Sequence, residues 1–195
     1  PVGNWGGFAE PNAHGRFARE QEIYLQITRR WRNLAKPMIA EVHGKCIAGG
    51  LMLAWACDLI VASDDAEFCD PVVTMGVCGV EWFVHPWELG PRKAKEMLFT
   101  ADVWSANEAH RLGMVNHVVP REELSAFVMK LAEKIAAKPS FALKLTKEAV
   151  NRSVDVIAPP SLTLEHLTRW LRPCVPGATF DGDGQGIAKE SPRDP

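Results

Sequence analysis

The sequence has none of the short cysteine and histidine patterns that mark metal sites and disulfide frameworks. Its five cysteines are odd in number and include no Cys-x-x-Cys pair, and its six histidines include no His-Glu-x-x-His pattern. Zinc sites and small disulfide-rich domains depend on such spacings. We therefore expect no metal site, and we expect free thiols in the reducing environment of a cytoplasmic protein.

Long apolar runs and an excess of one charge are also missing. The longest apolar stretch, from Ile47 to Cys57, is far shorter than the roughly 20 residues of a membrane-spanning helix. The formal net charge is only −2, so we expect neither nucleic acid nor an anionic membrane as a partner. Hydrophobic residues make up 47% and charged residues 24% of the 195, as in a globular domain with a substantial core.

Apolar periodicity predicts an α/β protein. Residues 16–35 repeat large apolar side chains at helical spacing, whereas 58–63 is a continuous apolar run of strand length. Ser105 and Glu108 have the spacing of a helix capping box. Segment 70–90 contains several Gly and Pro residues and predicts loops. The other expected elements are strands at 38–42, 66–69 and 114–119, helices at 88–99, 121–137 and 140–152, and a buried helix after Gly49.

The most informative segment is 36–50, which has the sequence KPMIAEVHGKCIAGG and is followed by CDLIVAS at 57–63. Further elements follow in order: FCDP at 68–71 with Gly76, GPRKA at 90–94, SANEA at 105–109, LGMV at 112–115 and VVP at 118–120. In order and spacing these motifs closely resemble the signature of the crotonase superfamily, the enoyl-CoA hydratase/isomerase family. The resemblance covers residues 16 to about 152.

The resemblance implies a fold and a general chemistry. The fold would be α/β, the crotonase-like (ClpP/crotonase) spiral of repeated strand-strand-helix units with an α-helical C-terminal region. Members are lyases or isomerases that bind acyl-CoA thioesters in fatty-acid or related metabolism, use no cofactor beyond the coenzyme A of the substrate, and form homotrimers or dimers of trimers. Residues 1–104 would then be the core, 105–155 the helical oligomerisation region, and 156–195 a partly disordered tail.

The small residues at 48–50 have physical properties that suit a ligand site. Glycines let a ligand atom approach the backbone closely, and a helix that begins there directs unpaired N–H groups at it. In the family the middle small residue, here Gly49, donates one N–H to the oxyanion hole that stabilises a thioester enolate. We expect Gly49 to be catalytic and Ile47, Ala48 and Gly50 to bind substrate. The alternative is that the glycines only permit tight packing of the helix against a strand.

The chain departs from the family pattern at the groups that transfer protons. The two glutamates of the hydratases align with Met52 and Val72, whose side chains cannot transfer a proton. We expect both side chains to line the substrate site. Nothing before Phe17 matches the strand that supplies the family's second N–H donor, so about a third of a typical member is expected to be missing at the start.

Two residues of the loop-rich segment are further candidates. Glu81 lies where some relatives carry another catalytic acid, and it is either that acid or a solvated loop carboxylate. His85 is expected to bind substrate or, alternatively, to fix the packing of its loop. Asp70 is expected to make a turn before Pro71, and Asp58 to bind backbone at the start of a strand.

Three hypotheses follow for the function. The chain could be an enzyme that stabilises an acyl-CoA enolate at Gly49 without being an efficient enoyl-CoA hydratase. It could instead be a non-catalytic acyl-CoA binder or decayed paralogue, or an assembly subunit. An enzyme binds CoA thioesters and turns over at least one of them, a binder binds without turnover, and an assembly subunit does neither.

Overall fold

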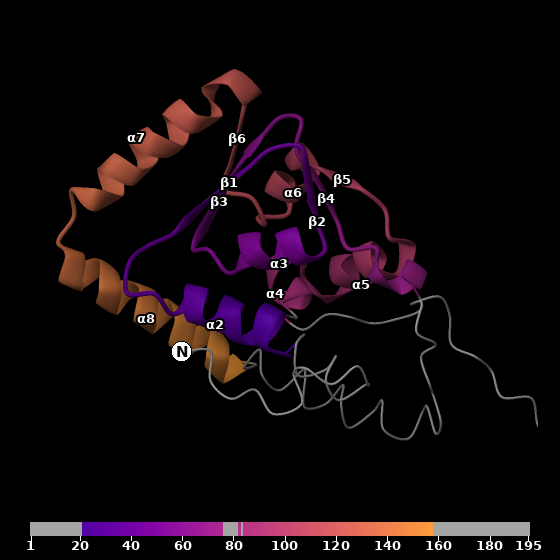
Figure 1. Cartoon of the computed structure of the whole chain (residues 1–195), viewed down its shortest axis with the longest axis horizontal. Coiled ribbons are helices and arrows are strands. Elements are labelled where there is room, and N and C mark those ends of the chain that lie inside the picture. Colours follow the sequence, from indigo (N-terminus) through magenta and orange to yellow (C-terminus); the bar gives the residue numbers. More distant parts are fainter. Residues whose placement is uncertain (1–20, 76–81, 83, 158–195) are drawn as a thin grey trace, which may run out of the picture.

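The computed structural model describes residues 21–75, 82 and 84–157. Its strands form two three-stranded sheets (Figure 1). The first sheet is parallel, with β3 (Leu59–Ser63) between β1 (Ile39–Val42) and β6 (His117–Val119). Its central strand β3 is apolar and mostly buried, as expected inside a parallel sheet, whereas Glu41 of β1 and His117 of β6 are exposed.

The second sheet is mixed. Its central strand β4 (Glu67–Cys69) pairs in parallel with β2 (Lys45–Ile47) and antiparallel with β5 (Trp104–Ser105). The chain alternates between the sheets, because β1 is followed by β2 and then a helix, and β3 is followed by β4. This alternation is the repeated strand-strand-helix unit that the sequence resemblance implies.

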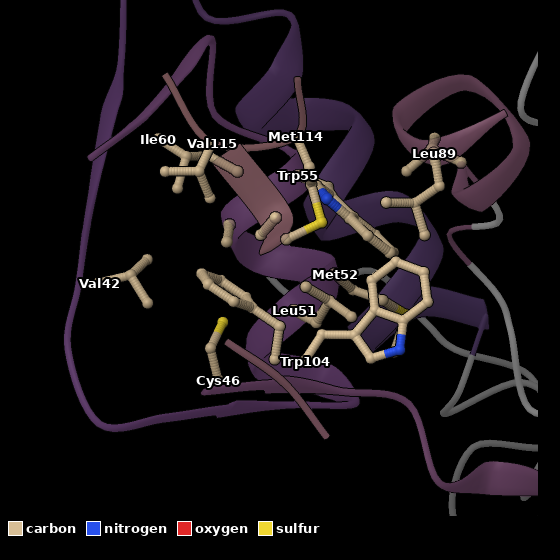
Figure 2. Packing of buried hydrophobic residues seen from close by; sticks show 14 of the residues in the cluster. Val42, Cys46, Leu51, Met52, Trp55, Ile60, Leu89, Trp104, Met114 and Val115 are labelled. Atoms are coloured by element: carbon tan, nitrogen blue, oxygen red, sulfur yellow. The ribbon is translucent and has the colours of Figure 1, made fainter. Parts of the chain in front are cut away.

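Helix α3 (Gly49–Trp55) lies at the centre of the core. It buries Leu51, Met52, Ala54 and Trp55, and a helix that is apolar on most of its surface has to be enclosed by the rest of the fold. Figure 2 shows Leu51, Met52 and Trp55 among residues of both sheets and of the helix that contains Leu89. The N-terminus of α3 is thereby fixed relative to the ends of β2 and β4.

Segment 70–90, expected to be loops, contains two short helices among its described residues. These are the 3-10 helix η2 (Val72–Met75) and α4 (His85–Leu89). Gly90, at φ +74°, ends α4 and turns the chain into α5 (Pro91–Thr100). The single helix expected at 88–99 is therefore divided at Gly90, because the residue before a proline disfavours the helical conformation.

The next two helices form where the sequence places them. Ser105 precedes α6 (Ala106–Arg111), and its hydroxyl oxygen accepts the backbone N–H of Glu108 at 3.2 Å. The Glu108 carboxylate binds Arg111 instead of returning to Ser105, so only half of the expected capping box forms. Helix α7 (Leu124–Ala136), after the 3-10 turn η3 (Arg121–Glu123), packs on the first sheet through a small cluster of Val61, Leu124 and Val128.

The last helix lies beside the first (Figure 1). The π-helix η1 (Gln21–Gln26) leads into α2 (Ile27–Arg32), and α8 (Ser140–Ile157) continues beyond the helix expected at 140–152. Arg32 of α2 forms a 3.0 Å ion pair with Asp155 of α8. No helix in the described part of the chain combines the length and the apolar character that crossing a membrane requires.

Candidate active site

The chain makes a strained turn between β2 and α3. Ala48 has φ +46° and ψ −109°, a conformation that a residue with a Cβ adopts at a cost of roughly 1–3 kcal/mol. Two hydrogen bonds hold it there: its N–H donates to the carbonyl of Cys69 at 3.0 Å, and its own carbonyl accepts the N–H of Met52 at 3.0 Å. These hydrogen bonds connect the Ala48 turn to the end of β4 and to the start of α3.

Gly49 is the first residue of α3, directly after this turn. No side chain caps the helix at Ala48, and the first N–H groups of a helix have no partner within it. The space beside Gly50 is open, because a Cβ placed there would have no neighbour within 4 Å. Packing within the described part of the chain therefore does not require a glycine at position 50, and this observation counts against the tight-packing alternative at that position.

The predicted site residues fall into two groups by exposure. Ile47 is 38% exposed and Gly50 is also exposed, so the turn from β2 into α3 reaches the surface. Met52 and Val72 are buried at 5% and 6% exposure. The structure thus combines an accessible backbone turn with an apolar interior, and neither position 52 nor position 72 places a titratable group there.

A buried Asp70–His85 pair lies next to the turn. His85 Nε2 and Asp70 Oδ2 are 2.9 Å apart, with the two side chains 0% and 2% exposed. The other carboxylate oxygen, Asp70 Oδ1, is buried and has no hydrogen-bond partner in the described part of the chain. The edge of the His85 ring faces the Trp55 ring, with centroids 4.6 Å apart.

Sequence reasoning missed the pairing of Asp70 with His85. Asp70 was expected to make a turn, but its carboxylate binds a side chain 15 residues away instead. His85, expected to bind substrate or to fix loop packing, is fully enclosed and begins α4. The other candidate of that segment, Glu81, lies outside the described residues. The only available signal was that both Asp70 and His85 directly precede a proline.

The cysteines near the turn do not have the properties of nucleophiles. Burial raises the pKa of Cys46 to about 11, and burial together with the neighbouring Asp70 charge raises the pKa of Cys69. Both thiols are therefore protonated at neutral pH, whereas attack requires the thiolate. No group of three His, Cys, Asp or Glu side chains suited to a metal ion occurs among the residues placed in the structure.

Asp58 has the structural role expected from the sequence. Its Oδ2 accepts the backbone N–H of Met38 at 2.7 Å, at the start of β1, and the Nζ of Lys147 in α8 at 2.8 Å. Lys147 Nζ also donates to the carbonyl of Lys36 at 3.1 Å. A hollow of about 470 Å³ is lined by residues that follow α2, such as Asn33, and by residues of α8, such as Lys147 and Asp155, and not by the Ala48 turn.

Comparison with solved structures supports the fold. A crystal structure of a probable enoyl-CoA hydratase from Mycobacterium smegmatis matches with a TM-score of 0.75 and 55% identity, over 77% of this chain and 62% of that one. An enoyl-CoA hydratase from Bacillus anthracis matches with a TM-score of 0.70 and 28% identity, over 82% of this chain and 62% of that one. The α/β crotonase fold expected from the motifs is therefore confirmed.

Sequence comparison gives the same relationship. The candidate enoyl-CoA hydratase EchA13 of Mycobacterium tuberculosis is 54% identical over 140 residues, which are 71% of this chain and 44% of that protein. The crotonyl-CoA hydratase of Syntrophomonas wolfei is 38% identical over 136 residues, 68% of this chain and 52% of that protein. The chain thus spans about half the length of these relatives. The sequence profile of the enoyl-CoA hydratase/isomerase family matches residues 10–167, and the chain belongs to that family.

Proposed function

We propose that this chain binds an acyl-CoA thioester and holds the thioester oxygen on the N–H of Gly49. The strained turn at Ala48 carries the proposal, because backbone strain of this kind is retained where it positions a functional group. The turn ends at the exposed start of α3, where open space beside Gly50 leaves room for a ligand. Membership of a family of CoA-thioester enzymes supplies the class of ligand.

The chemistry at Gly49 is the stabilisation of an enolate. When a proton leaves the carbon next to a thioester, negative charge develops on the thioester oxygen. A backbone N–H held in position stabilises that charge without reorganisation, and removing one such donor typically costs 10²–10³ in rate. Because the donor is backbone, the site needs no particular side chain at position 49, only free access to the N–H.

We further propose that the reaction is a lyase or isomerase reaction other than efficient hydration of an enoyl-CoA. Hydration needs one group to activate water and one to protonate carbon. The family's two glutamates align with Met52 and Val72; both side chains are buried, and Met52 belongs to the main apolar cluster. A non-catalytic acyl-CoA binder is the second candidate, because the same two substitutions would leave binding intact and abolish proton transfer.

Calorimetry with acetyl-CoA and a short enoyl-CoA tests the binding proposal. The variant Gly49→Pro removes the N–H donor and should lower any turnover roughly 10²–10³-fold. The matched control is Ser140→Pro, which places a proline at the first position of the exposed helix α8, where the missing N–H has no helical partner. If folded protein binds none of the CoA thioesters, the proposal is wrong.

We also propose that the chain assembles as a homotrimer or a dimer of trimers. Helices α7 and α8 leave large apolar side chains in solvent: Met129 at 59% exposure, Phe141 at 67% and Val150 at 57%. Exposed apolar surface of this kind is often covered in an oligomer. Sedimentation should show a species larger than the monomer at micromolar concentration, and a well-folded monomer would contradict the proposal.

A further inference from the structure

We propose that Asp70 is the proton-transferring base of this site and that His85 is its positioning residue. The pair would take the role of the glutamates that the family has at the positions of Met52 and Val72. This inference rests on the proposed binding of an acyl-CoA thioester at Gly49. It adds the group that moves the proton, which the proposed function leaves without a residue.

Asp70 lies close in the fold to Gly49, the proposed oxyanion donor. In the parallel pair of β2 and β4, Ile47 is in register with Cys69. Ala48 and Asp70 are therefore the next residues of the two strands, and the N–H of Ala48 donates to the carbonyl of Cys69 at 3.0 Å. The carboxylate thus belongs to the residue that leaves β4 beside the turn into Gly49. A base that acts next to a thioester carbonyl has to lie close to the group that binds the carbonyl oxygen.

His85 packs against α3. Its ring packs edge-on against Trp55 at 4.6 Å between centroids. Met52 precedes Trp55 by three residues, and residues so spaced lie on the same face of a helix. The pair therefore contacts α3 at Trp55, one helical turn after Met52, and its carboxylate begins the chain segment that continues to Val72. Met52 and Val72 are the two places at which the family has its carboxylates.

One oxygen of the Asp70 carboxylate, Oδ1, is buried without a hydrogen bond in the described part of the chain. A buried carboxylate oxygen without a hydrogen bond costs free energy, and most buried polar atoms have a partner, so an exception calls for an explanation such as a catalytic role. His85 Nε2 lies 2.9 Å from Oδ2, while Oδ1 has no partner among the described residues. A carboxylate oxygen without a competing hydrogen bond can accept a proton from a substrate carbon.

The proposed step is a proton shuttle that consumes no other reactant. Asp70 Oδ1 takes a proton from the α-carbon of a β,γ-unsaturated acyl-CoA. The C–H bond breaks, an O–H bond forms, and the electron pair moves through the thioester carbon to its oxygen, which Gly49 N–H holds. The carboxylic acid then returns the proton to the γ-carbon, which yields the conjugated α,β-unsaturated thioester and restores the carboxylate. Substrate and product are isomers.

Access to the buried pair requires one side chain to move. Met52 is the candidate, because it is 5% exposed and lies one helical turn before Trp55, whose ring contacts His85. Its unbranched thioether side chain repacks at lower cost than that of a β-branched residue. Displacement of Met52 by the acyl chain would join the open turn at Gly50 to the Asp70 carboxylate.

The test measures the conversion of a short 3-enoyl-CoA to its conjugated isomer by the gain of conjugated thioester absorbance. The variants are Asp70→Asn, His85→Phe and His85→Gln, and the control is Asp102→Asn, which changes an exposed carboxylate. Asp70→Asn should lower kcat roughly 10²–10⁴-fold while the Kd for the thioester stays within a few-fold. His85→Phe should lower kcat similarly, whereas His85→Gln, whose amide can still donate to Oδ2, should recover most of it.

Two kinetic results overturn the inference directly. Asp70 is not the base if Asp70→Asn has the same kcat as Asp102→Asn. It is also not the base if the unmutated protein binds the thioester and does not isomerise it. If Asp70→Asn does not fold, the histidine variants decide, because a role in packing alone predicts equal kcat for folded His85→Phe and His85→Gln. Failure of the unmutated protein to bind any thioester instead refutes the proposed function itself, and calorimetry on the same samples distinguishes the two failures.

Discussion

Glu88 should make the stability of this protein fall as pH rises through neutrality. The residue lies in α4 and lines a small cavity of about 120 Å³ with Trp55 and Asn116. Burial raises the pKa of its carboxyl from 4.5 to about 7. The folded protein therefore keeps the proton between these values, whereas the unfolded chain releases it.

The direction and the size of the effect follow from proton linkage. Because the folded state binds more protons at Glu88 between pH 4.5 and 7, the contribution of Glu88 to stability is complete below pH 4.5, decreases over this window and is lost above it. One pKa unit corresponds to about 1.4 kcal/mol, so the loss due to Glu88 is at most about 3.5 kcal/mol. The variant Glu88→Gln carries no proton to lose and should remove this part of the pH dependence.

Urea unfolding at pH 5 and pH 8 provides the assay. Between these values the unmutated protein should lose more free energy of unfolding than Glu88→Gln does, by as much as about 2–3 kcal/mol. Glu133→Gln, at an exposed position of α7, is the matched control and should keep the dependence of the unmutated protein. Equal pH dependence in Glu88→Gln and the unmutated protein would refute the argument that burial keeps this carboxyl protonated.

Three further variants test the local structure by urea unfolding. Ser105→Ala removes the hydroxyl that caps α6 and should cost about 1 kcal/mol, with an unchanged stability indicating that the cap does not form in solution. Lys147→Met removes the Nζ that joins Asp58 and the Lys36 carbonyl and should lower the free energy of unfolding by about 2 kcal/mol. The same substitution should cost less in a protein that already carries Asp58→Asn. Ala48→Val places a β-branched residue at φ +46° and should cost at least about 1 kcal/mol, whereas a neutral result would mean that the turn relaxes.

The central strands and helices could be predicted from sequence because local pattern determines them. The run at 58–63 is apolar throughout and forms β3, and the apolar stripe at 121–137 forms α7 after a short 3-10 turn. Strands β2 and β5 were missed, since they have only three and two residues and are defined by pairing with β4 and not by their own sequence. Such short strands carry no period that a sequence window can detect.

The candidate site could be predicted only in the part that is continuous in sequence. The glycines at 49 and 50 and the residues around them form one motif, and the structure places them in one turn. The Asp70–His85 pair joins two positions 15 residues apart across a segment with no periodic pattern. Nothing in the sequence near either residue specifies the other as its partner, because the contact arises where the end of β4 meets the start of α4 in the folded chain.

One assay tests the central claim directly: a short 2-enoyl-CoA is mixed with the purified protein while calorimetry records binding and absorbance records loss of the conjugated thioester. We predict that the thioester binds and that Gly49→Pro weakens this binding. We also predict that the rate of absorbance loss stays near background, because positions 52 and 72 carry Met and Val. Loss of absorbance at ordinary enzyme rates, persisting in Asp70→Asn and Glu81→Gln, would contradict this prediction and show that water is activated by other groups.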